Sequence, residues 1–378
     1  MLYLGIDQHS KQITVCVRDA SGNVVLRQQV STRPEKVTTF FESLCERDGQ
    51  FMAIVEVCGF NDWLIDLLKR YGCREIILIH PEKTSKKKTD RRDANKLCEL
   101  LWLNGARLAE GLKPQGLRRV YIPNSREQQD RQVTILRKRV GEQRTRTVNK
   151  IQRILHRHNL MWSYPTKTFQ TIRGRKWLQD VSLPTIDRLE LDQLLEQWEL
   201  WDRQLAQLDE QIVERARFKE SGQVMSKTEL LATSPGVNHY SGLALTSRIG
   251  PIERFPRPRS LANYFGLTPG CRNSGNLTDR LGSITKEGSS MARFILGQLV
   301  LHVLKQDPQM RQWYRRIKGR RGSKIARVAV MRRLTTIFWH MLTHNEPYSA
   351  GGPPRLRLAS KELSSKRPLP PGQAKPVA

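Results

Sequence analysis

Apolar and polar positions alternate in short blocks along the first third of the chain. Apolar runs typical of β-strands cover residues 3–7, 13–18, 24–30, 51–57 and 75–80. Amphipathic helices are expected at 34–47 and 62–71, and turn-forming residues at 19–23 predict a hairpin. Three strands followed by alternating helices and strands predict a mixed α/β sheet with an antiparallel start and a parallel finish.

Helical periodicity replaces this pattern in the rest of the chain. An intermittent apolar stripe over 118–157 predicts one long helix with a packed seam. In a second helix, over 191–212, apolar residues step by threes and fours as in a coiled coil. This helix either folds back on the first or pairs two chains. Residues 230–250 predict two helices around a turn at Pro235, which is either a helix-hairpin-helix that holds a DNA phosphate or an ordinary helical hairpin.

These patterns divide the chain into four parts. A polar, glycine-containing loop at 264–280 precedes a more apolar helix at 289–305. The predicted parts are an α/β domain at 1–110, a basic helical and coiled-coil region at 111–222, a mostly helical domain at 223–347 and a tail at 348–378. The tail is rich in Pro, Lys and Arg, so we expect it to be disordered and to add non-specific affinity for phosphates.

The charge balance restricts the class of partner. The chain has 65 Lys and Arg against 36 Asp and Glu, a formal net charge of +29. Such a balance favours a nucleic-acid or anionic-membrane partner over a small neutral substrate. The longest apolar run, near 294–304, is far shorter than the roughly 20 residues of a membrane-spanning helix. The N-terminal residues do not read as a secretory signal, and the six cysteines lack zinc-binding or disulfide spacing. The sequence therefore predicts a cytoplasmic protein without a membrane partner.

Four carboxylates occupy positions suited to a metal site. Asp7 ends the first predicted strand and Glu56 closes the fourth; these strands are neighbours in ribonuclease-H-like (RuvC-like) nuclease folds, whose order of elements matches. Asp90 and Asp93 share one face of the first turn of a helix. Four gathered acids repel one another unless cations neutralise them, and two Mg²⁺ about 3.5–4 Å apart are the usual solution in phosphodiester cleavage. The alternative is that these acids are turn or helix-cap residues or partners in intrahelical salt bridges, although Glu56 is costly to bury alone.

Basic residues surround the acid pair and continue along the long helix. In the segment KKKTDRRDANKL, the bases expected to hold phosphates are Lys86, Lys87, Lys88, Arg91 and Arg92. From 118 to 157, twelve Lys and Arg stand against three acids, an excess that intrahelical pairing does not explain. On that helix the expected nucleic-acid contacts are Arg137, Lys138, Arg139, Arg144 and Arg146.

Short motifs in a fixed order resemble one family. GIDQHS carries Asp7, AIVEVCG carries Glu56, and KTDRRDANKL carries Asp90 and Asp93. SPGVNHYSGLAL, YFGLTPGCRNSGN and TKEG follow in the C-terminal part. Together they resemble the DEDD transposases of bacterial insertion sequences, relatives of the Piv-type DNA invertases and of the recombinases guided by a bridge RNA. The resemblance covers nearly the whole chain, up to about residue 348.

The resemblance implies a DNA transposase or site-specific recombinase of an insertion sequence. It makes the four acids metal ligands for Mg²⁺, with Mn²⁺ as an alternative, and it makes Ser274 the nucleophile. Arg272 and Arg280 flank this serine and are expected to contact the scissile phosphate. The implied partners are DNA, a non-coding guide RNA and further copies of the chain, in a dimer or tetramer with active sites completed between subunits. The implied location is the bacterial cytoplasm, in association with the nucleoid.

Three other functions stay open from the residues alone. A structure-selective nuclease, such as a Holliday-junction resolvase, would use the acids without Ser274. A sugar-kinase-like or actin-like phosphotransferase also begins with an Asp-bearing hairpin, but it would need glycines after Asp7, where Gln8, His9 and Ser10 stand. A non-catalytic nucleic-acid-binding protein would explain the charge and leave Glu56 unexplained.

Overall fold

The computed structural model describes the backbone of residues 1–47, 50–80, 90–219, 222–271 and 281–349. The side chains of 90–92, 271 and 281 lie outside this description, as does the predicted tail from 350 onward. The chain forms two compact units, Met1–Ile122 and Pro123–Ala378. None of the described helices is long and apolar enough to cross a membrane.

The first unit is built on a six-stranded mixed sheet. Its strands, in the spatial order β3-β2-β1-β4-β5-β6, are β1 (Leu2–Gln8), β2 (Gln12–Arg18), β3 (Val24–Ser31), β4 (Phe51–Glu56), β5 (Glu75–Ile79) and β6 (Arg119–Val120). Its helices are α1 (Pro34–Arg47), α2 (Asp62–Arg70), α3 (Asp90–Leu103) and α4 (Gly105–Ala109). The pairs β1–β2 and β2–β3 are antiparallel, whereas β1–β4 and β4–β5 are parallel. The predicted mixed sheet is therefore confirmed, and the short antiparallel β6 adds to it.

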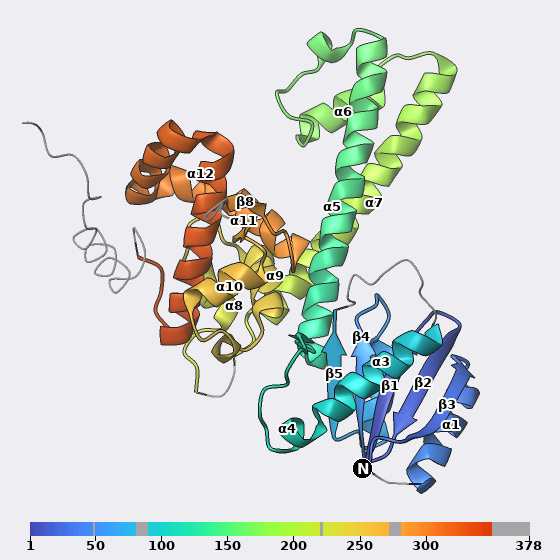
Figure 1. Ribbon diagram of the computed structural model, residues 1–378. Coiled ribbons are helices and arrows are strands. Elements are labelled where there is room, and N and C mark those ends of the chain that lie inside the picture. Colours follow the sequence, from blue (N-terminus) through green and yellow to red (C-terminus); the bar gives the residue numbers. More distant parts are fainter. Residues whose placement is uncertain (48–49, 81–89, 220–221, 272–280, 350–378) are drawn as a thin grey trace, which may run out of the picture. The chain divides into compact units, whose positions relative to one another are not determined.

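Helices cover both faces of this sheet (Figure 1). Side chains of a strand alternate between the faces, so Ile6 and Val55 pack with Phe41 of α1 in one buried cluster. On the opposite face, Ile54 belongs to a second buried cluster with Leu97 of α3. Each strand of the sheet centre is thus buried on both sides, which is why these segments read as nearly continuous apolar runs.

Helix α3 lies very close to β1 because Gly5 has no side chain. A Cβ added to Gly5 would lie 2.3 Å from the Ala94 carbonyl oxygen and 2.3 Å from the Cys98 amide nitrogen. The Cys98 thiol also donates a hydrogen bond to the Tyr3 carbonyl oxygen at 3.1 Å. The glycine therefore sets how near the first half of α3 lies to the centre of the sheet.

Two long helices of the second unit run side by side (Figure 1). Helix α5 (Ser125–Arg157) begins after Asn124, whose side chain forms a capping box with Glu127. Helix α7 (Thr185–Ala216) runs back along α5 after η1 (Met161–Ser163) and α6 (Ile172–Asp180). The buried residues that join these helices are Ile151, Ile154, Leu155, Leu178, Leu191, Leu194 and Trp198. The second predicted helix therefore folds back on the first within one chain.

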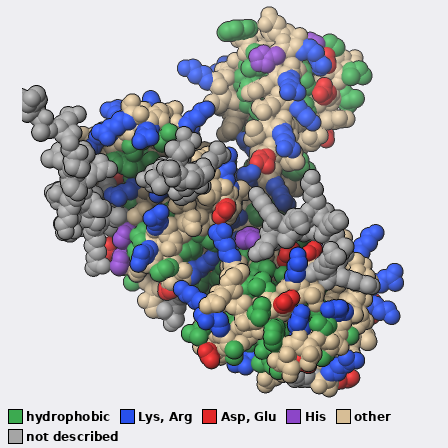
Figure 2. All heavy atoms as spheres, in the orientation of Figure 1, with side chains coloured by type: hydrophobic (Ala, Val, Ile, Leu, Met, Phe, Trp, Pro, Cys, Tyr) green, Lys and Arg blue, Asp and Glu red, His purple; other side chains and the backbone are tan. Residues whose placement is uncertain are grey.

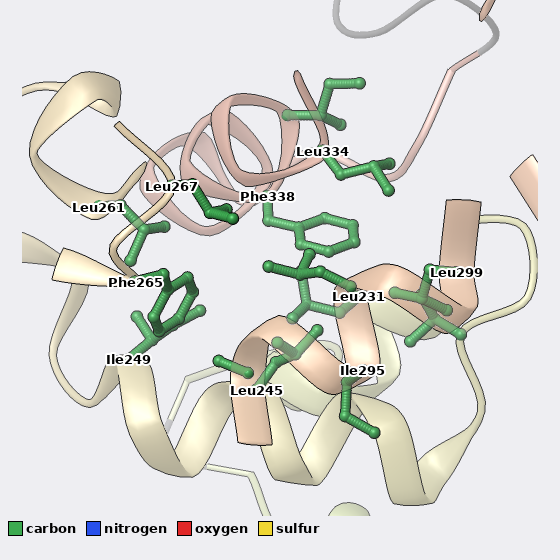
Figure 3. Close-up of a cluster of buried hydrophobic side chains, with 14 of the residues drawn as sticks. Leu231, Leu245, Ile249, Leu261, Phe265, Leu267, Ile295, Leu299, Leu334 and Phe338 are labelled. Carbon is green, nitrogen blue, oxygen red and sulfur yellow. The ribbon is translucent and has the colours of Figure 1, made fainter. Parts of the chain in front are cut away.

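The remaining elements of the second unit form a mostly helical domain around one large core (Figure 3). They are α8 (Lys227–Ala232), α9 (His239–Ile249), η2 (Ile252–Arg254), α10 (Pro258–Tyr264), β7 (Pro269–Cys271), β8 (Leu281–Ile284), α11 (Ser290–Gln306) and α12 (Pro308–His344). Leu245 of α9, Leu299 of α11 and Phe338 of α12 meet in the core. The predicted helix pair around Pro235 is confirmed as α8 and α9, and the predicted apolar helix as α11. Helix α12 has no counterpart among the predicted elements.

Candidate active site and nucleic-acid interface

Asp7 and Glu56 lie at the same end of two neighbouring strands. The parallel register pairs Ile6 of β1 with Val55 of β4, and each acid is the next residue of its strand. Alternation places Asp7 on the face of Gly5, and it places Glu56 on the face of Ile54. Gly5 and Ile54 both pack towards α3. The two strand-end carboxylates thus lie at one end of the sheet, as the sequence predicted, and they also share one face of it.

The first turn of α3 lies at that same edge. Ala94 and Cys98 contact β1 at Gly5, and Cys98 reaches back to Tyr3. Helix α3 therefore runs antiparallel to β1, and its N-terminal turn lies near the Asp7 end of the strand. Asp93 directly precedes Ala94 and is partly buried. Asp90 is the first residue of α3, about 4.5 Å beyond Asp93 along the helix axis, and its side chain lies outside the described ones.

A buried amide network ties the ends of β1 and β4 together beside the acids. The Asn61 side-chain amide donates to Gln8 Oε1 at 2.8 Å and to the Glu56 carbonyl oxygen at 3.0 Å. Gln8 in turn donates to the Phe60 carbonyl oxygen at 3.0 Å. Sequence reasoning missed Gln8 and Asn61 as positioning residues. In the sequence, Gln8 is only a polar residue directly after Asp7, and Asn61 is only a cap position before α2. Neither feature predicts the hydrogen bond between them.

Asp7 has polar neighbours on both sides. His9 Nε2 lies 3.2 Å from Asp7 Oδ2, whose side chain is only 13% exposed. Thr14 of β2 stands opposite Asp7 in the antiparallel register. The Thr14 hydroxyl is buried and has no hydrogen-bond partner among the described residues. A buried, unsatisfied hydroxyl beside a carboxylate fits a site that receives a further polar group, such as a hydrated cation.

The donor set at this edge suits Mg²⁺, because hard divalent cations prefer carboxylate oxygens. Asp7, Glu56 and Asp93 supply such oxygens from three elements that converge there. Among residues with described side chains, which do not include Asp90, no three His, Cys, Asp or Glu are grouped closely enough to hold a metal ion. The four-carboxylate centre therefore stays a prediction.

Several arginines of α5 pair with acids of α7. Arg137 Nε and Nη2 donate to the two carboxylate oxygens of Asp209 at 2.9 and 3.2 Å. Arg144 Nε donates to Asp202 Oδ1 at 2.5 Å, and Arg175 of α6 binds the same carboxylate. Burial raises the pKa of Asp202, but the hydrogen bonds from Arg175 and Arg144 outweigh it and leave that pKa lowered. The basic excess of α5 is thus partly matched by a helix with nine acids and three bases.

The predicted basic contacts of α5 consequently fall into two classes. Arg137 and Arg144 form the interhelical pairs, and Lys138 pairs with Glu142 on its own helix. Arg139 and Arg146 are exposed and make no ion pair among the described residues. The second class forms no salt bridge with a described residue and interacts with Glu142 only through longer-range attraction, so its charge is more available to a polyanion. Sequence analysis could not separate the classes, because Asp202 and Asp209 are 58 and 72 residues away from their partners.

We expect Arg139→Gln with Arg146→Gln to weaken nucleic-acid binding and to flatten its salt dependence. Each lost phosphate contact lowers the slope of log affinity against log salt by about 0.9 on duplex DNA and about 0.7 on single strands. Arg137→Gln with Arg144→Gln should instead lower the melting temperature and leave the slope nearly unchanged. Fluorescence anisotropy over a salt series, together with calorimetry, measures both. Equal slopes for the two double variants would show that pairing with α7 does not determine which arginines contact the nucleic acid.

The other predicted site residues lie outside the described part of the structure. Lys86, Lys87, Lys88, Arg272, Ser274 and Arg280 belong to segments 81–89 and 272–280. Arg91 and Arg92 are in the first turn of α3, but their side chains are not described. The serine segment follows β7 and precedes β8 in the sequence, and these two strands pair antiparallel.

The helix pair α8–α9 has the tight turn that the sequence predicted. Gly236 adopts φ +81°, and a Cβ added there would lie 2.3 Å from His302 Cβ. At the start of α9, the Asn238 side chain accepts from the Ser241 amide at 2.9 Å. One amide of the helix N-terminus is therefore occupied by a cap. Binding of a DNA phosphate at this turn stays a prediction.

Comparisons with known proteins agree with these motifs. A family model described as "Transposase" (DEDD_Tnp_IS110) matches residues 4–160, which contain the four acids. Another, described as "Transposase IS116/IS110/IS902 family", matches residues 228–315, which contain Ser274.

Similar proteins extend over most of the chain. The transposase for insertion sequence element IS1111A of Coxiella burnetii is 27% identical over 357 residues, which cover 92% of this chain and 91% of that protein. A probable family 20 transposase of Pseudomonas aeruginosa is 22% identical over 92% of this chain and 98% of its own. A pilin gene-inverting protein of Moraxella bovis is 28% identical over 151 residues, 39% of this chain and 46% of that protein. The chain belongs to the DEDD family of insertion-sequence transposases, and it is an enzyme of DNA transposition and recombination.

Proposed function

We propose that this transposase cuts and rejoins DNA strands with a divalent-metal site made by Asp7, Glu56, Asp90 and Asp93 and with Ser274 as the nucleophile. The observation that carries the proposal is the arrangement at one sheet edge: two strand-end carboxylates in adjacent register and the acidic first turn of α3. A ribonuclease-H-like sheet with the order β3-β2-β1-β4-β5 supports the same reading.

The carboxylates and the serine have separate tasks in this proposal. Mg²⁺, when bound, would stabilise the negative charge that develops on the phosphodiester during attack. The Gln8–Asn61 network joins the residue after Asp7 to the Glu56 backbone carbonyl, so it would keep the two strand ends in position for metal binding. As the Ser274 oxygen bonds to phosphorus, the bond from phosphorus to one DNA oxygen breaks. The hydroxyl proton passes to solvent water, and the released DNA oxygen takes up a proton from solvent to become a hydroxyl. The resulting phosphoserine conserves the bond energy, so a second DNA end can later displace the serine.

The partners are part of the proposal as well. Element ends and target DNA are the substrates, a non-coding guide RNA selects them, and copies of the chain assemble as a dimer or tetramer. The net charge of +29 suits a protein that binds several nucleic acids at once. Active sites shared between subunits would let the acids of one chain serve the serine of another.

A covalent-trapping experiment tests the serine. With Mg²⁺, element-end DNA and the cognate RNA, wild-type protein should form a protein–DNA adduct that survives denaturation, and Ser274→Ala should form none. Ser283→Ala, on β8, is the matched control and should keep the adduct. If Ser274→Ala cleaves DNA at the wild-type rate without forming an adduct, the resolvase-like mechanism is correct instead.

A further inference from the structure

Helix α12 carries the most one-sided charge of any helix in the described part of the chain. It contains ten Lys and Arg and no Asp or Glu over 37 residues. It starts directly after α11, and most of it lies beyond residue 315, where the second family match ends. Figure 2 shows several Lys and Arg side chains in the region where Figure 1 labels α12.

The middle of α12 projects into solvent. Both ends are anchored in the large core, by Met310 at the start and by Val330 and Phe338 further on. Between them, residues 315–325 contain no buried position, although a helix lying on a surface buries one residue in every three or four. A Cβ added to Gly319 or to Gly322 would meet nothing within 4 Å. We call residues 315–325 the basic arm.

The arm bends at one residue. Gly322 has φ 81° and ψ 166°, which interrupts the helix within α12. This region of backbone conformation is almost closed to residues other than glycine. The bend therefore divides α12 into two helical segments, and bases of the arm lie on either side of it.

The charges of the arm have no partners within the chain's described residues. Its six bases, Arg315, Arg316, Lys318, Arg320, Arg321 and Lys324, are all exposed, and none forms an ion pair there. In this they differ from Arg137 and Arg144 of α5, which are neutralised by α7. Bases without salt-bridge partners on a protruding element can neutralise the phosphates of a nucleic acid. This displaces the condensed counterions of the nucleic acid and favours binding.

We propose that the basic arm inserts into the major groove of duplex DNA and contacts phosphates on both groove walls; this rests on the proposed function, which makes DNA the substrate. A helix with side chains is about 10–12 Å across, and the B-DNA major groove is about 12 Å wide. At about 100° per residue, the five bases from Arg315 to Arg321 point to all sides of the helix. A groove, with phosphates to either side, matches such a distribution.

Other polyanions fit the arm less well. A-form RNA has a major groove too deep and narrow for such an element to enter. A flat anionic membrane favours a helix with bases on one face and a broad apolar face opposite. The arm has bases all round and only Ile325 as a well-exposed large apolar side chain, at 55% exposure.

The test removes three bases next to the bend from the full-length protein. Arg320→Gln, Arg321→Gln and Lys324→Gln are combined, because glutamine keeps helix propensity. Binding to a mixed-sequence DNA duplex, a matched RNA duplex and phosphatidylserine vesicles is measured by fluorescence anisotropy and co-sedimentation over a salt series, with EDTA present. We expect at least about a tenfold loss for duplex DNA and a salt slope reduced by up to about 2.7. RNA and vesicle binding should change by less than about twofold, since the arm contacts neither.

The matched control removes three exposed bases around α6, as Lys167→Gln, Arg173→Gln and Lys176→Gln. It should keep the wild-type slope on DNA. Equal losses in both triple variants, an unchanged DNA slope, or a larger loss on RNA or vesicles would each overturn the arm proposal. Because EDTA removes catalysis from the assay, failure of DNA cleavage by the wild type would count against the proposed function alone, while arm-dependent binding would still stand.

Discussion

Glu56→Gln and Asp93→Asn are each expected to reduce DNA strand cleavage by more than about a hundredfold, while duplex binding changes by less than about twofold. The amide keeps the shape of the carboxylate and removes the charge that balances a divalent cation. Glu56 closes β4 next to Asp7, and Asp93 lies in the first turn of α3 at the same edge. Asp90→Asn should behave in the same way.

The control for these variants is an acid of the same unit that is not at this edge. Asp66 of α2 is exposed and pairs only weakly, with Lys69 at 3.8 Å, so Asp66→Asn should cleave at the wild-type rate. Cleavage is followed on labelled element-end duplexes at saturating Mg²⁺, and binding is measured separately without metal. Cleavage by Glu56→Gln or Asp93→Asn within about twofold of wild type would refute the metal assignment. Loss of binding alongside cleavage would point to a folding defect.

The sheet of the first unit could be predicted because its segments obey simple periodicities. The strands at 51–57 and 75–80 are apolar on both faces, and α1 presents one apolar face. The two-residue β6 was missed because so short an edge strand has no period to detect. Helix α12 was missed because its apolar spacing is interrupted by Gly319, Gly322 and a dense run of bases.

The candidate site was predictable only as far as it depends on strand ends. Asp7 and Glu56 could be placed at one edge because parallel neighbours end together. The Gln8–Asn61 network could not be predicted, because it joins residues 53 positions apart in the sequence. Their approach depends on the path of a loop that the sequence does not specify. The unpaired Thr14 hydroxyl likewise follows from the exact register of β1 with β2. On α5, the interhelical pairing of Arg137 and Arg144 depends on how α7 folds back.

The close contact between α3 and β1 gives the other large expected effect: Gly5→Ala should lower the free energy of unfolding by at least about 2 kcal/mol. The new methyl group would meet the Ala94 carbonyl oxygen and the Cys98 amide nitrogen, each at 2.3 Å. Both are backbone atoms, so no side-chain rotation relieves the contact and α3 has to move away from the sheet. Urea unfolding of the full-length protein, followed by near-ultraviolet circular dichroism, measures the loss.

Displacement of α3 should also reduce cleavage beyond what unfolding explains. The helix carries Asp93 and Asp90 to the edge where β1 carries Asp7, and a shift of about 1 Å in catalytic groups can cost about a hundredfold in rate. We therefore expect Gly5→Ala to cleave poorly even at a temperature where it is fully folded and binds DNA normally. Gly59→Ala is the matched control, because an added Cβ there meets nothing within 4 Å and stability and cleavage should stay near wild type. If Gly5→Ala unfolds normally and cleaves at the wild-type rate, α3 does not set the geometry of the acids; if it is destabilised yet cleaves normally when folded, the contact is structural and Asp93 is not held by it.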